Sequence, residues 1–298
     1  MTEQLKTALI GAGRWAKNIA PQLDTATRFA AYASRLGSEP TPWLTEHCPG
    51  ARHTTIEEIC ADPTLDAVVV ATPIATHAEI AHRLLEAGKH VLVEKPLAQS
   101  SAEAQALAEL ATARGLVLAT GYQFLFHPVY VELKRRLDPR QLQSITLTWR
   151  KYGTFEEPIE FSLLTHHLAL ALDLLGRPTG GTLQRLGQVE SACDAIETTL
   201  VYPKTEVVSL IDRGSRVTSH SMSFDLEDGS AYMWTGDKLL HVEETEAEAV
   251  VVFESSELPL TIEIARFIEA VSGKTALPTA GDFGARVLQI QEMLQSVK

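Results

Sequence analysis

A glycine-rich segment near the start of the chain is the first feature with chemical meaning. Gly11-Ala12-Gly13-Arg14-Trp15-Ala16 follows the apolar run Leu5–Ile10 and leads into a helical pattern. The segment has the G-x-G-x-x-G/A spacing, in which Gly11 allows a tight turn and Gly13 lets a pyrophosphate approach backbone amides at a helix N-terminus. This context predicts a dinucleotide site rather than a purely structural turn. The expected contacts are Gly11, Gly13, Arg14 and Trp15.

The residues after the second β-rich run indicate which dinucleotide is bound. The run Arg28–Ala33 leads into Ser34-Arg35, and no acidic residue follows until Glu39. An NAD site usually places an acid here for the ribose hydroxyls, whereas Ser and Arg can hold a 2′-phosphate. A charge-assisted hydrogen bond of roughly 1.5–3 kcal/mol corresponds to about a tenfold to hundredfold preference. We therefore expect NADP, with NAD possible; the alternative is that Arg35 is only a solvated loop residue.

Polar residues also follow the apolar run Ala67–Ala71. Thr72 and Pro73 come directly after it, and Thr76 and His77 begin the next helical stretch. In a doubly wound sheet the ligand crevice lies at the carboxyl ends of the strands, so we expect Thr72 and Pro73 to contact the cofactor. Thr76 is expected to cap the helix, and His77 either to contact the cofactor or to cap.

The pattern of the first 120 residues predicts the elements that position these side chains. Short β-rich runs alternate with helical stretches, which is typical of a parallel sheet covered by helices. Hydroxyl residues with Glu three positions later mark helix starts, and Gly88 and Gly115 mark helix ends. The expected strands are Leu5–Ile10, Arg28–Ala33, Ala67–Ala71, His90–Val93 and Leu116–Ala119. The expected capping pairs are Thr55 with Glu58, Thr76 with Glu79 and Ser100 with Glu103.

The pattern changes after about Gly121. Long alternating segments such as Ile145–Arg150 are separated by turns at Asp228-Gly229 and Gly236-Asp237, which predicts a largely antiparallel sheet. The predicted fold class is α/β, a Rossmann doubly wound parallel sheet over residues 1–120, followed by an α+β domain with a largely antiparallel open sheet over residues 121–298. The helices expected in this second part are Phe161–Leu175, Leu258–Val271 and Asp282–Val297.

Composition excludes several classes of protein. With 298 residues, 45% hydrophobic and 21% charged, the chain is that of an ordinary folded protein. A net charge of −12 without a basic patch argues against nucleic acid and anionic membrane partners. Three widely spaced cysteines fit neither a disulfide framework nor a zinc site, and no run of 18 apolar residues occurs. We expect a cytoplasmic protein without a metal.

Glu94-Lys95-Pro96, which directly follows the expected strand His90–Val93, carries a resemblance to a known family. Together with the glycine-rich segment, Ala71-Thr72-Pro73 and His166, it resembles the Gfo/Idh/MocA family, and the resemblance covers the whole chain. The resemblance implies an NAD(P)-dependent oxidoreductase acting mostly on sugars, cyclitols or their derivatives. It also implies that the second domain often mediates oligomers, so we expect a homo-oligomer formed through the second-domain sheet.

The same resemblance assigns a catalytic role to Lys95, close to the nicotinamide and the reacting hydroxyl. A cation beside this oxygen would stabilise developing alkoxide as the proton leaves. The alternative is a surface lysine paired with Glu94. Pro96 would fix the turn that directs Lys95, with a cis peptide bond as in some relatives. Glu94 and Gln123 are expected near the cofactor.

In the second domain the family has a helix with Asp, then His four residues later, then an apolar run ending in Gly. His166 aligns by its ten-residue distance from Gly176, but Ser162 replaces the Asp. On one α-helix Ser162 and His166 would share a face, although a serine cannot supply the negative charge that favours imidazolium. We expect His166 to exchange the proton, against the alternative of a structural histidine. His167 points about 100° away and does not complete a metal site with it.

The leading hypothesis is an NADP-preferring oxidoreductase that transfers a hydride between nicotinamide and a sugar-like or cyclitol-like hydroxyl or carbonyl. Its substrate contacts would be Lys95, Ser162 and His166, with Arg150 and Lys151 as weaker candidates. Many relatives have Arg where this chain has Leu125. Because Leu125 replaces this Arg and Ser162 replaces the Asp of the family, a catalytically silent NAD(P)-binding sensor remains an alternative function. A biliverdin-reductase-like enzyme is the other alternative.

Overall fold

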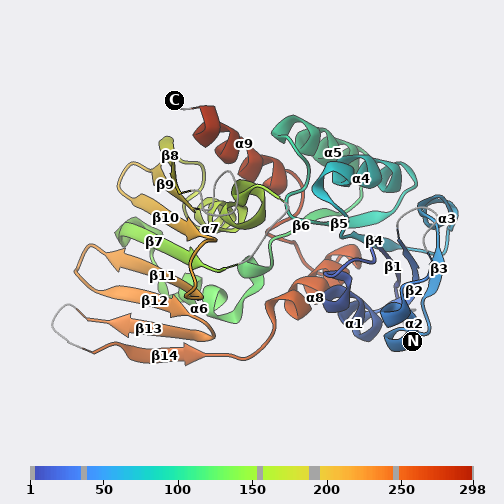
Figure 1. Cartoon of the computed structure of the whole chain (residues 1–298), viewed down its shortest axis with the longest axis horizontal. Helices are drawn as coiled ribbons and strands as arrows, with labels where there is room; N and C mark the ends of the chain where they lie inside the picture. Colours follow the sequence, from blue (N-terminus) through green and yellow to red (C-terminus); the bar gives the residue numbers. More distant parts are fainter. Residues whose placement is uncertain (1–3, 35–38, 153–156, 188–194, 244–247, 297–298) are drawn as a thin grey trace. The chain divides into compact units, whose positions relative to one another are not determined.

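The computed structural model describes residues 4–34, 39–152, 157–187, 195–243 and 248–296 (Figure 1). These residues form two compact units, the first reaching to Gln123 and including Leu260–Ala285, the second made of Phe124–Pro259 and the chain from Arg286 onward. The segment 260–285 therefore packs with the first unit, although the sequence pattern assigned everything after residue 120 to the second. It stays a prediction that the first domain binds the cofactor and the second binds the substrate.

The first unit is built on a six-stranded sheet in the order β3-β2-β1-β4-β5-β6. Every strand pair is parallel, so the predicted Rossmann fold is confirmed. The strands are β1 (Lys6–Ile10), β2 (Arg28–Ala33), β3 (Arg52–Thr54), β4 (Ala67–Val70), β5 (His90–Glu94) and β6 (Leu118–Gly121). The short edge strand β3 was not predicted. All four residues of β4 are buried, as expected for a central strand covered on both faces.

Helices cover both faces of this sheet. Ile19 and Leu23 of α1 and Ile264 and Phe267 of α8 are in one buried cluster with Leu9 of β1. Helices α4 and α5 contact each other, and α4 contacts β4 and β5 (Figure 1). The helices of this unit are α1 (Ala16–Ala26), α2 (Pro42–His47), α3 (Ile56–Ala61), α4 (His77–Glu86), α5 (Ser101–Ala113) and α8 (Pro259–Val271), with 3₁₀ turns η1 (Ile74–Thr76) and η2 (Gln123–Phe126), the latter continuing into the second unit.

Two of the three predicted capping boxes are confirmed. The side chain of Thr55 accepts from the Glu58 amide, and that of Ser100 accepts from the Glu103 amide, with the reciprocal Glu bonds present. The prediction for Thr76 is wrong, because its hydroxyl makes no capping bond to α4. It donates instead to Thr72 Oγ1 and to the Pro73 carbonyl, each at 2.8 Å, because η1 precedes α4 without an extended residue between them.

The second unit contains an eight-stranded sheet in the order β14-β13-β12-β11-β7-β10-β9-β8. Only β7 and β10 pair in parallel, which confirms the largely antiparallel sheet. The strands are β7 (Leu142–Arg150), β8 (Gly180–Gly187), β9 (Ala195–Val201), β10 (Glu206–Asp212), β11 (Ser219–Leu226), β12 (Ala231–Thr235), β13 (Lys238–Val242) and β14 (Val250–Glu254). The predicted turns lie between β11 and β12 and between β12 and β13, with positive φ at Gly229 and Gly236.

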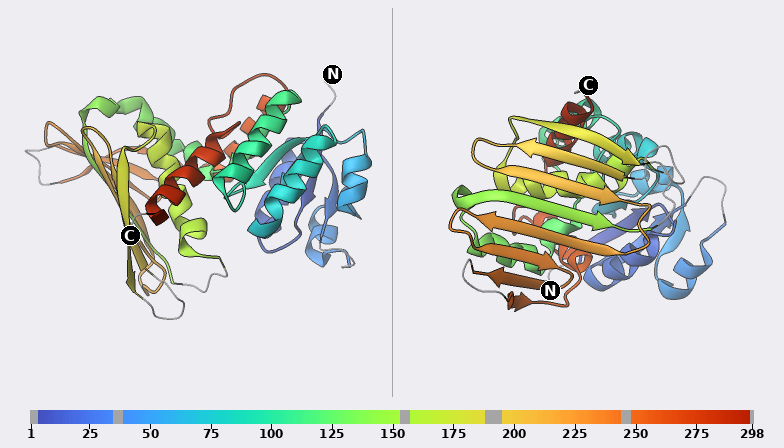
Figure 2. Two further views of the ribbon diagram at one scale, coloured as in Figure 1. Left: turned by 90° about the horizontal axis from the view of Figure 1, so that it is seen from above. Right: turned by 60° about the vertical axis from the view of Figure 1, so that its left-hand side comes forward.

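Helices cover one face of this sheet (Figure 2). They are α6 (Pro128–Arg136), the π-helix η4 (Glu160–Leu164), α7 (Thr165–Leu175) and α9 (Phe283–Ser296), with the 3₁₀ turn η3 (Pro139–Gln141). The strands alternate accordingly: in β9, Ile196, Thr198 and Leu200 are buried between more exposed neighbours. The first eight residues of α7 are all buried. Within the described ranges, none of the helices is both long enough and apolar enough to cross a membrane.

Candidate active site

The glycine-rich segment contains two glycines with different constraints. Gly11 has φ +107°, its amide donates to the Ala33 carbonyl at 2.9 Å, and a Cβ there would collide with the Ala71 carbonyl oxygen. The fold itself therefore requires glycine at this position. Around Gly13, by contrast, a Cβ would meet no atom within 4 Å. The chain leaves open space in front of this backbone, as a pyrophosphate would need.

The N-terminus of α1 is suited to an anion. Trp15 occupies the N-cap position without a side-chain capping bond, and the first turn has no acidic residue. The positive end of the helix dipole is therefore not neutralised by its own first turn. Together with the space at Gly13, this end of α1 fits the diphosphate of a dinucleotide.

Glu94, at the carboxyl end of β5, is connected to this loop. Its Oε1 accepts the indole N–H of Trp15 at 2.7 Å, and its Oε2 accepts the backbone N–H of Lys95 at 3.3 Å. Burial raises the pKa of Glu94, and the Lys95 ammonium and the two hydrogen bonds oppose that rise. Gly121 of β6 pairs with Glu94, and a Cβ there would lie only 3.3 Å from its carboxylate. The predicted direct contact of Glu94 with the cofactor stays a prediction.

Lys95 follows β5, and its peptide bond with Pro96 is cis, as the resemblance implied. The side chain is half-buried. Because β1, β4 and β5 are adjacent and parallel, the residues after their carboxyl ends share one edge of the sheet: Gly11, Thr72 and Lys95. This is the edge at which doubly wound sheets bind ligands.

Both ring nitrogens of His77 contact backbone carbonyl oxygens. Nδ1 lies 2.7 Å from the Pro96 carbonyl oxygen, and Nε2 lies 2.7 Å from the Thr72 carbonyl oxygen. The side chain is 1% exposed. These contacts favour a structural link between the two segments over the predicted direct contact with a cofactor. Pro73 is exposed beside it, at the start of η1.

At the end of β2, Ser34 Oγ lies 2.7 Å from His53 Nε2, and the His53 ring lies 5.1 Å from that of Tyr32. Sequence reasoning missed His53 because the three residues of β3 show no apolar pattern that would place a strand there. Arg35, the other predicted phosphate contact, lies outside the described residues.

In the second unit the predicted single helix Phe161–Leu175 is wrong at its start. Residues Glu160–Leu164 form a π-helix, and the α-helix begins only at Thr165. Ser162 is buried in the π-turn, with its Oγ 3.5 Å from the Ile159 carbonyl oxygen, so its spacing to His166 is not that of an α-helix. π-turns inside helices are frequent at functional sites.

His166 and His167 face different surroundings. The ring of His166 packs edge-on against Phe124, with 4.9 Å between centroids, and 5.6 Å from Trp149. His167 Nδ1 lies 2.6 Å from Ser209 Oγ on β10. Burial, assisted by His220, holds the pKa of His167 well below its usual value, so this ring is neutral. His167 therefore belongs to the helix–sheet interface.

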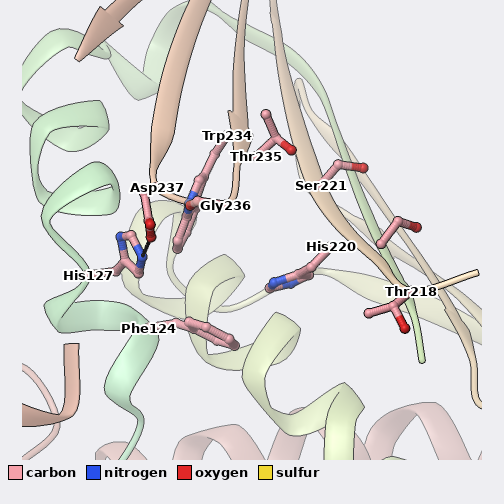
Figure 3. A pocket seen from close by; sticks show the side chains of 10 residues that line it. Phe124, His127, Thr218, His220, Ser221, Trp234, Thr235, Gly236 and Asp237 are labelled. Atoms are coloured by element: carbon pink, nitrogen blue, oxygen red, sulfur yellow. Dashed lines mark hydrogen bonds and ion pairs between the residues drawn. The ribbon is translucent and has the colours of Figure 1, made fainter. Parts of the chain in front are cut away.

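A cavity of about 470 Å³ opens beside Phe124 on the second unit (Figure 3). Phe124, His220 and Trp234 provide its rings, with 5.1 Å between the centroids of Phe124 and His220 and 6.0 Å between those of Phe124 and Trp234. Its lining residues are Phe124, His127, Thr218, Ser219, His220, Ser221, Trp234, Thr235, Gly236 and Asp237. Aromatic rings and a carboxylate can bind a small polyhydroxylated ring through its C–H surface and its hydroxyl groups.

Two histidines of this cavity, His127 and His220, are mostly unprotonated and therefore uncharged at pH 7. Burial and the neighbouring His127 lower the pKa of His220 to about 4. Burial also lowers the pKa of His127, although Asp237 opposes this, and His127 Nε2 lies 3.9 Å from Asp237 Oδ1. Asp237 is mostly exposed, so its carboxylate is the charged acceptor at the rim.

Comparison with known proteins matches the first part of the chain to a family. A family model described as an oxidoreductase family with an NAD-binding Rossmann fold matches residues 5–122. Residues 5–122 of this chain match the Gfo/Idh/MocA family. Within the described residues, no group of three or more His, Cys, Asp or Glu side chains is arranged to hold a metal ion.

Two relatives from Bacillus subtilis (strain 168) show the range of cofactors named in the Gfo/Idh/MocA family. A scyllo-inositol 2-dehydrogenase (NAD(+)) is 32% identical over 149 residues, covering 48% of this chain and 42% of the relative. A scyllo-inositol 2-dehydrogenase (NADP(+)) is 25% identical over 169 residues, covering 51% and 47%. The matched stretches therefore span less than half the length of either relative.

A solved structure shares the fold of this chain over nearly its full length. The UDP-N-acetylglucosamine 3-dehydrogenase of Acidithiobacillus ferrooxidans matches with a TM-score of 0.89 and 22% identity, covering 99% of this chain and 97% of that one. At this identity the likeness concerns the fold.

Sequence reasoning missed most of the cavity. His220, Trp234 and Asp237 lie on or beside β11, β12 and β13, and only the pairing of these strands brings them together. His127 and Phe124 also line the cavity, and the sequence alone predicts a role for neither of them. Tyr122, which precedes these residues, is 1% exposed and packs edge-on against Phe283.

Proposed function

We propose that this chain is an NAD(P)-dependent dehydrogenase or reductase acting on a hydroxyl or carbonyl group of a small sugar-like or cyclitol-like substrate. The observation that carries the proposal is the position of Lys95 at the carboxyl edge of the first-unit sheet. It shares this edge with Gly11 and with the open backbone at Gly13. Both relatives described above are named as inositol dehydrogenases, which supports the substrate class.

Each proposed residue has a separate task. When bound, the nicotinamide cofactor accepts or supplies the hydride. The Lys95 ammonium would stabilise negative charge that develops on the substrate oxygen, because a cation there is worth more in the transition state than in the ground state. His166 would accept the hydroxyl proton during oxidation and return it during reduction. Ser162 would orient the imidazole or a substrate hydroxyl.

The aromatic cavity would hold the non-reacting part of the substrate. Phe124 and Trp234 offer ring faces and edges for the C–H surface of a sugar or cyclitol. Asp237 can accept hydrogen bonds from one or two hydroxyl groups at the rim. A substrate with several hydroxyl groups and no phosphate fits this lining, because the only full charge among the lining residues that the structure describes is negative at neutral pH.

We infer a preference for NADP from the end of β2. Ser34 is placed there beside His53, and Arg35 follows in sequence. A 2′-phosphate could bind the Ser34 hydroxyl, the Arg35 guanidinium and the His53 ring, whereas no carboxylate comes before Glu39 for the ribose of NAD. Parallel titrations with NADPH and NADH should show tighter binding of NADPH. Arg35→Ala should remove about a tenfold to hundredfold advantage without weakening NADH.

Turnover with a panel of inositols, aldoses and nucleotide-free amino sugars tests the activity itself. Oxidation or reduction that is lost in Lys95→Ala but kept in Lys274→Ala, an exposed lysine, would support the proposal. Tight cofactor binding without turnover on any alcohol or carbonyl would instead favour a binding protein. That second function is suggested by Ser162, which stands four residues before His166 where the family has a carboxylate.

We also propose a homo-oligomer in the cytoplasm, formed through the sheet face that α7 does not cover. On this face β11 presents Ser219, Ser221 and Ser223, which alternate with the more buried Met222 and Phe224. Light scattering coupled to size exclusion should then give a mass of two or more chains of 32.6 kDa. Glu197→Lys and Thr199→Lys on the same face of β9 should reduce that mass.

A further inference from the structure

His77 combines two properties that restrict its protonation. The side chain is 1% exposed at the start of α4. Its Nδ1 is 2.7 Å from the Pro96 carbonyl oxygen, and its Nε2 is 2.7 Å from the Thr72 carbonyl oxygen. A backbone carbonyl oxygen is only an acceptor, so each contact needs a proton on the nitrogen.

Neutral imidazole cannot satisfy this arrangement. It carries one N–H, and its other nitrogen would direct a lone pair at a carbonyl lone pair at hydrogen-bonding distance. Rotating the ring by 180° would place carbon atoms at both positions, about 0.6 Å or more inside an ordinary C–H···O separation. Only imidazolium, with both nitrogens protonated, donates to both carbonyls.

We propose that His77 is an imidazolium clamp that joins the carboxyl ends of β4 and β5 and positions Lys95. Thr72 lies two residues after β4, and Pro96 directly follows Lys95. The Thr72 segment is itself held by the hydrogen bond from Thr76 Oγ1 to Thr72 Oγ1 at 2.8 Å. The clamp therefore connects the turn beside the glycine-rich segment to the loop that carries Lys95.

The titratable groups around His77 include Lys95, which directly precedes Pro96. Residues 71–76 include no titratable side chain. On α4 and on the elements packed against it, the titratable side chains are Glu79, His82, Arg83 and Glu86 of α4, His90 and Glu94 of β5, and Glu103 and Glu109 of α5. Hydrogen bonds to two carbonyl dipoles stabilise the charged ring itself, because bonds to the charged form favour it.

Nitrogen-15 NMR of histidine side chains in the full-length protein tests the clamp without any substrate. At pH 8, about 1.5 units above the usual histidine pKa, both ring nitrogens of His77 should carry a proton. The signals are assigned by their loss in His77→Gln, or in His77→Asn if the former does not fold. His82→Gln is the matched control, because His82 is an exposed histidine on the same helix. A His77 signal with one unprotonated nitrogen would overturn the proposal.

The positioning of Lys95 rests on the proposed function and has its own readout. His77→Gln, which keeps one donor and no charge, should lower kcat by roughly 10- to 100-fold, as expected for a displaced catalytic group. NADPH affinity should stay within about threefold, because the diphosphate site on α1 is unchanged. Unchanged kcat in a folded His77→Gln would remove the positioning role. Absence of turnover in every variant including wild type would reject the proposed function, while the NMR result would still decide the clamp.

Discussion

Trp15 donates its indole N–H to Glu94 across a sequence separation of 79 residues, at 2.7 Å. This bond joins the glycine-rich segment after β1 to the carboxyl end of β5, although β4 lies between these two strands. Trp15 is 39% exposed, so part of its ring is accessible to solvent. The bond between Trp15 and Glu94 therefore couples the position of the glycine-rich segment to that of Lys95, which directly follows Glu94.

Trp15→Phe removes the indole N–H donor but keeps an aromatic ring, so it tests the contribution of the hydrogen bond alone. We expect a loss of about 1 kcal/mol in the free energy of unfolding, because the bond is partly exposed and Glu94 can turn to water. NADPH affinity should fall about threefold to tenfold as the loop loosens. Urea unfolding and calorimetric titration measure the two effects. Trp43→Phe, on α2, controls for the loss of an indole; an equal fall in affinity there would contradict the role of the bond.

Alanine at Gly11 and at Gly13 should affect different properties. Gly11→Ala introduces a Cβ against the Ala71 carbonyl at φ +107°, so we expect roughly 1–3 kcal/mol or more of destabilisation. Gly13→Ala meets nothing in the protein, so stability should change by less than about 0.5 kcal/mol. A methyl group in front of that backbone should still obstruct the cofactor diphosphate and weaken NADPH binding. Equal stability of both variants would show that the strain at Gly11 is absent.

Lys95→Ala should reduce turnover by about 10²- to 10⁴-fold, the usual contribution of a group that acts on proton and charge at the reacting oxygen. NADPH affinity should change little, because the lysine acts on the substrate. Lys95→Arg keeps a cation but alters its reach, and we expect an intermediate activity. Single-turnover hydride transfer, followed by NADPH absorbance, measures the step directly. Full activity in Lys95→Ala would reject the assignment.

The sequence predicts the first unit well because its signals are local. Five of its six strands and two of three capping boxes follow from apolar runs and from Ser or Thr spaced before Glu. Thr76 had the same spacing but bonds to Thr72, because a 3₁₀ turn competes for its hydroxyl. The return of α8 to the first unit could not be predicted, since an amphipathic helix shows which face is apolar and not which sheet it covers.

The second unit was harder to predict because its candidate site is made of distant residues. His166 could be placed by its spacing from Gly176, whereas the π-turn before it has no sequence signature. Trp234 and His220 meet only through the register of β11 with β12. Residues on neighbouring strands share a cavity through pairing, and pairing partners are not encoded by spacing along the chain.

Glu263 should make the stability of the protein depend on pH. It is 2% exposed on α8, and burial together with the nearby Glu94 raises its pKa well above the usual value of a glutamate. Its folded form therefore keeps the proton at pH values where the unfolded chain ionises. The stabilisation is complete below about pH 4.5 and is lost as the pH rises toward the folded pKa.

Glu263→Gln should remove that dependence, because the amide is neutral in both states. We expect the variant to be more stable than wild type at pH 8 and equal to it near pH 4, measured by thermal unfolding at each pH. Glu257→Gln, at an exposed position just before α8, should leave the difference between the two pH values unchanged. A wild-type Tm that rises between pH 5 and pH 8 relative to Glu263→Gln would show that Glu263 is ionised in the folded protein.

Asp237 offers a test of the cavity that should spare the fold, because it is mostly exposed on the turn after β12. Asp237→Asn keeps the shape but removes the charged acceptor, and a hydrogen bond to a charged group contributes more than a neutral one. We expect KM for a polyhydroxylated substrate to rise roughly tenfold, with kcat and NADPH affinity nearly unchanged. Asp282→Asn, at an exposed position of the first unit, is the control. If kcat falls and KM stays constant, Asp237 acts on the reacting atoms, and the cavity is not the place where the rest of the substrate binds.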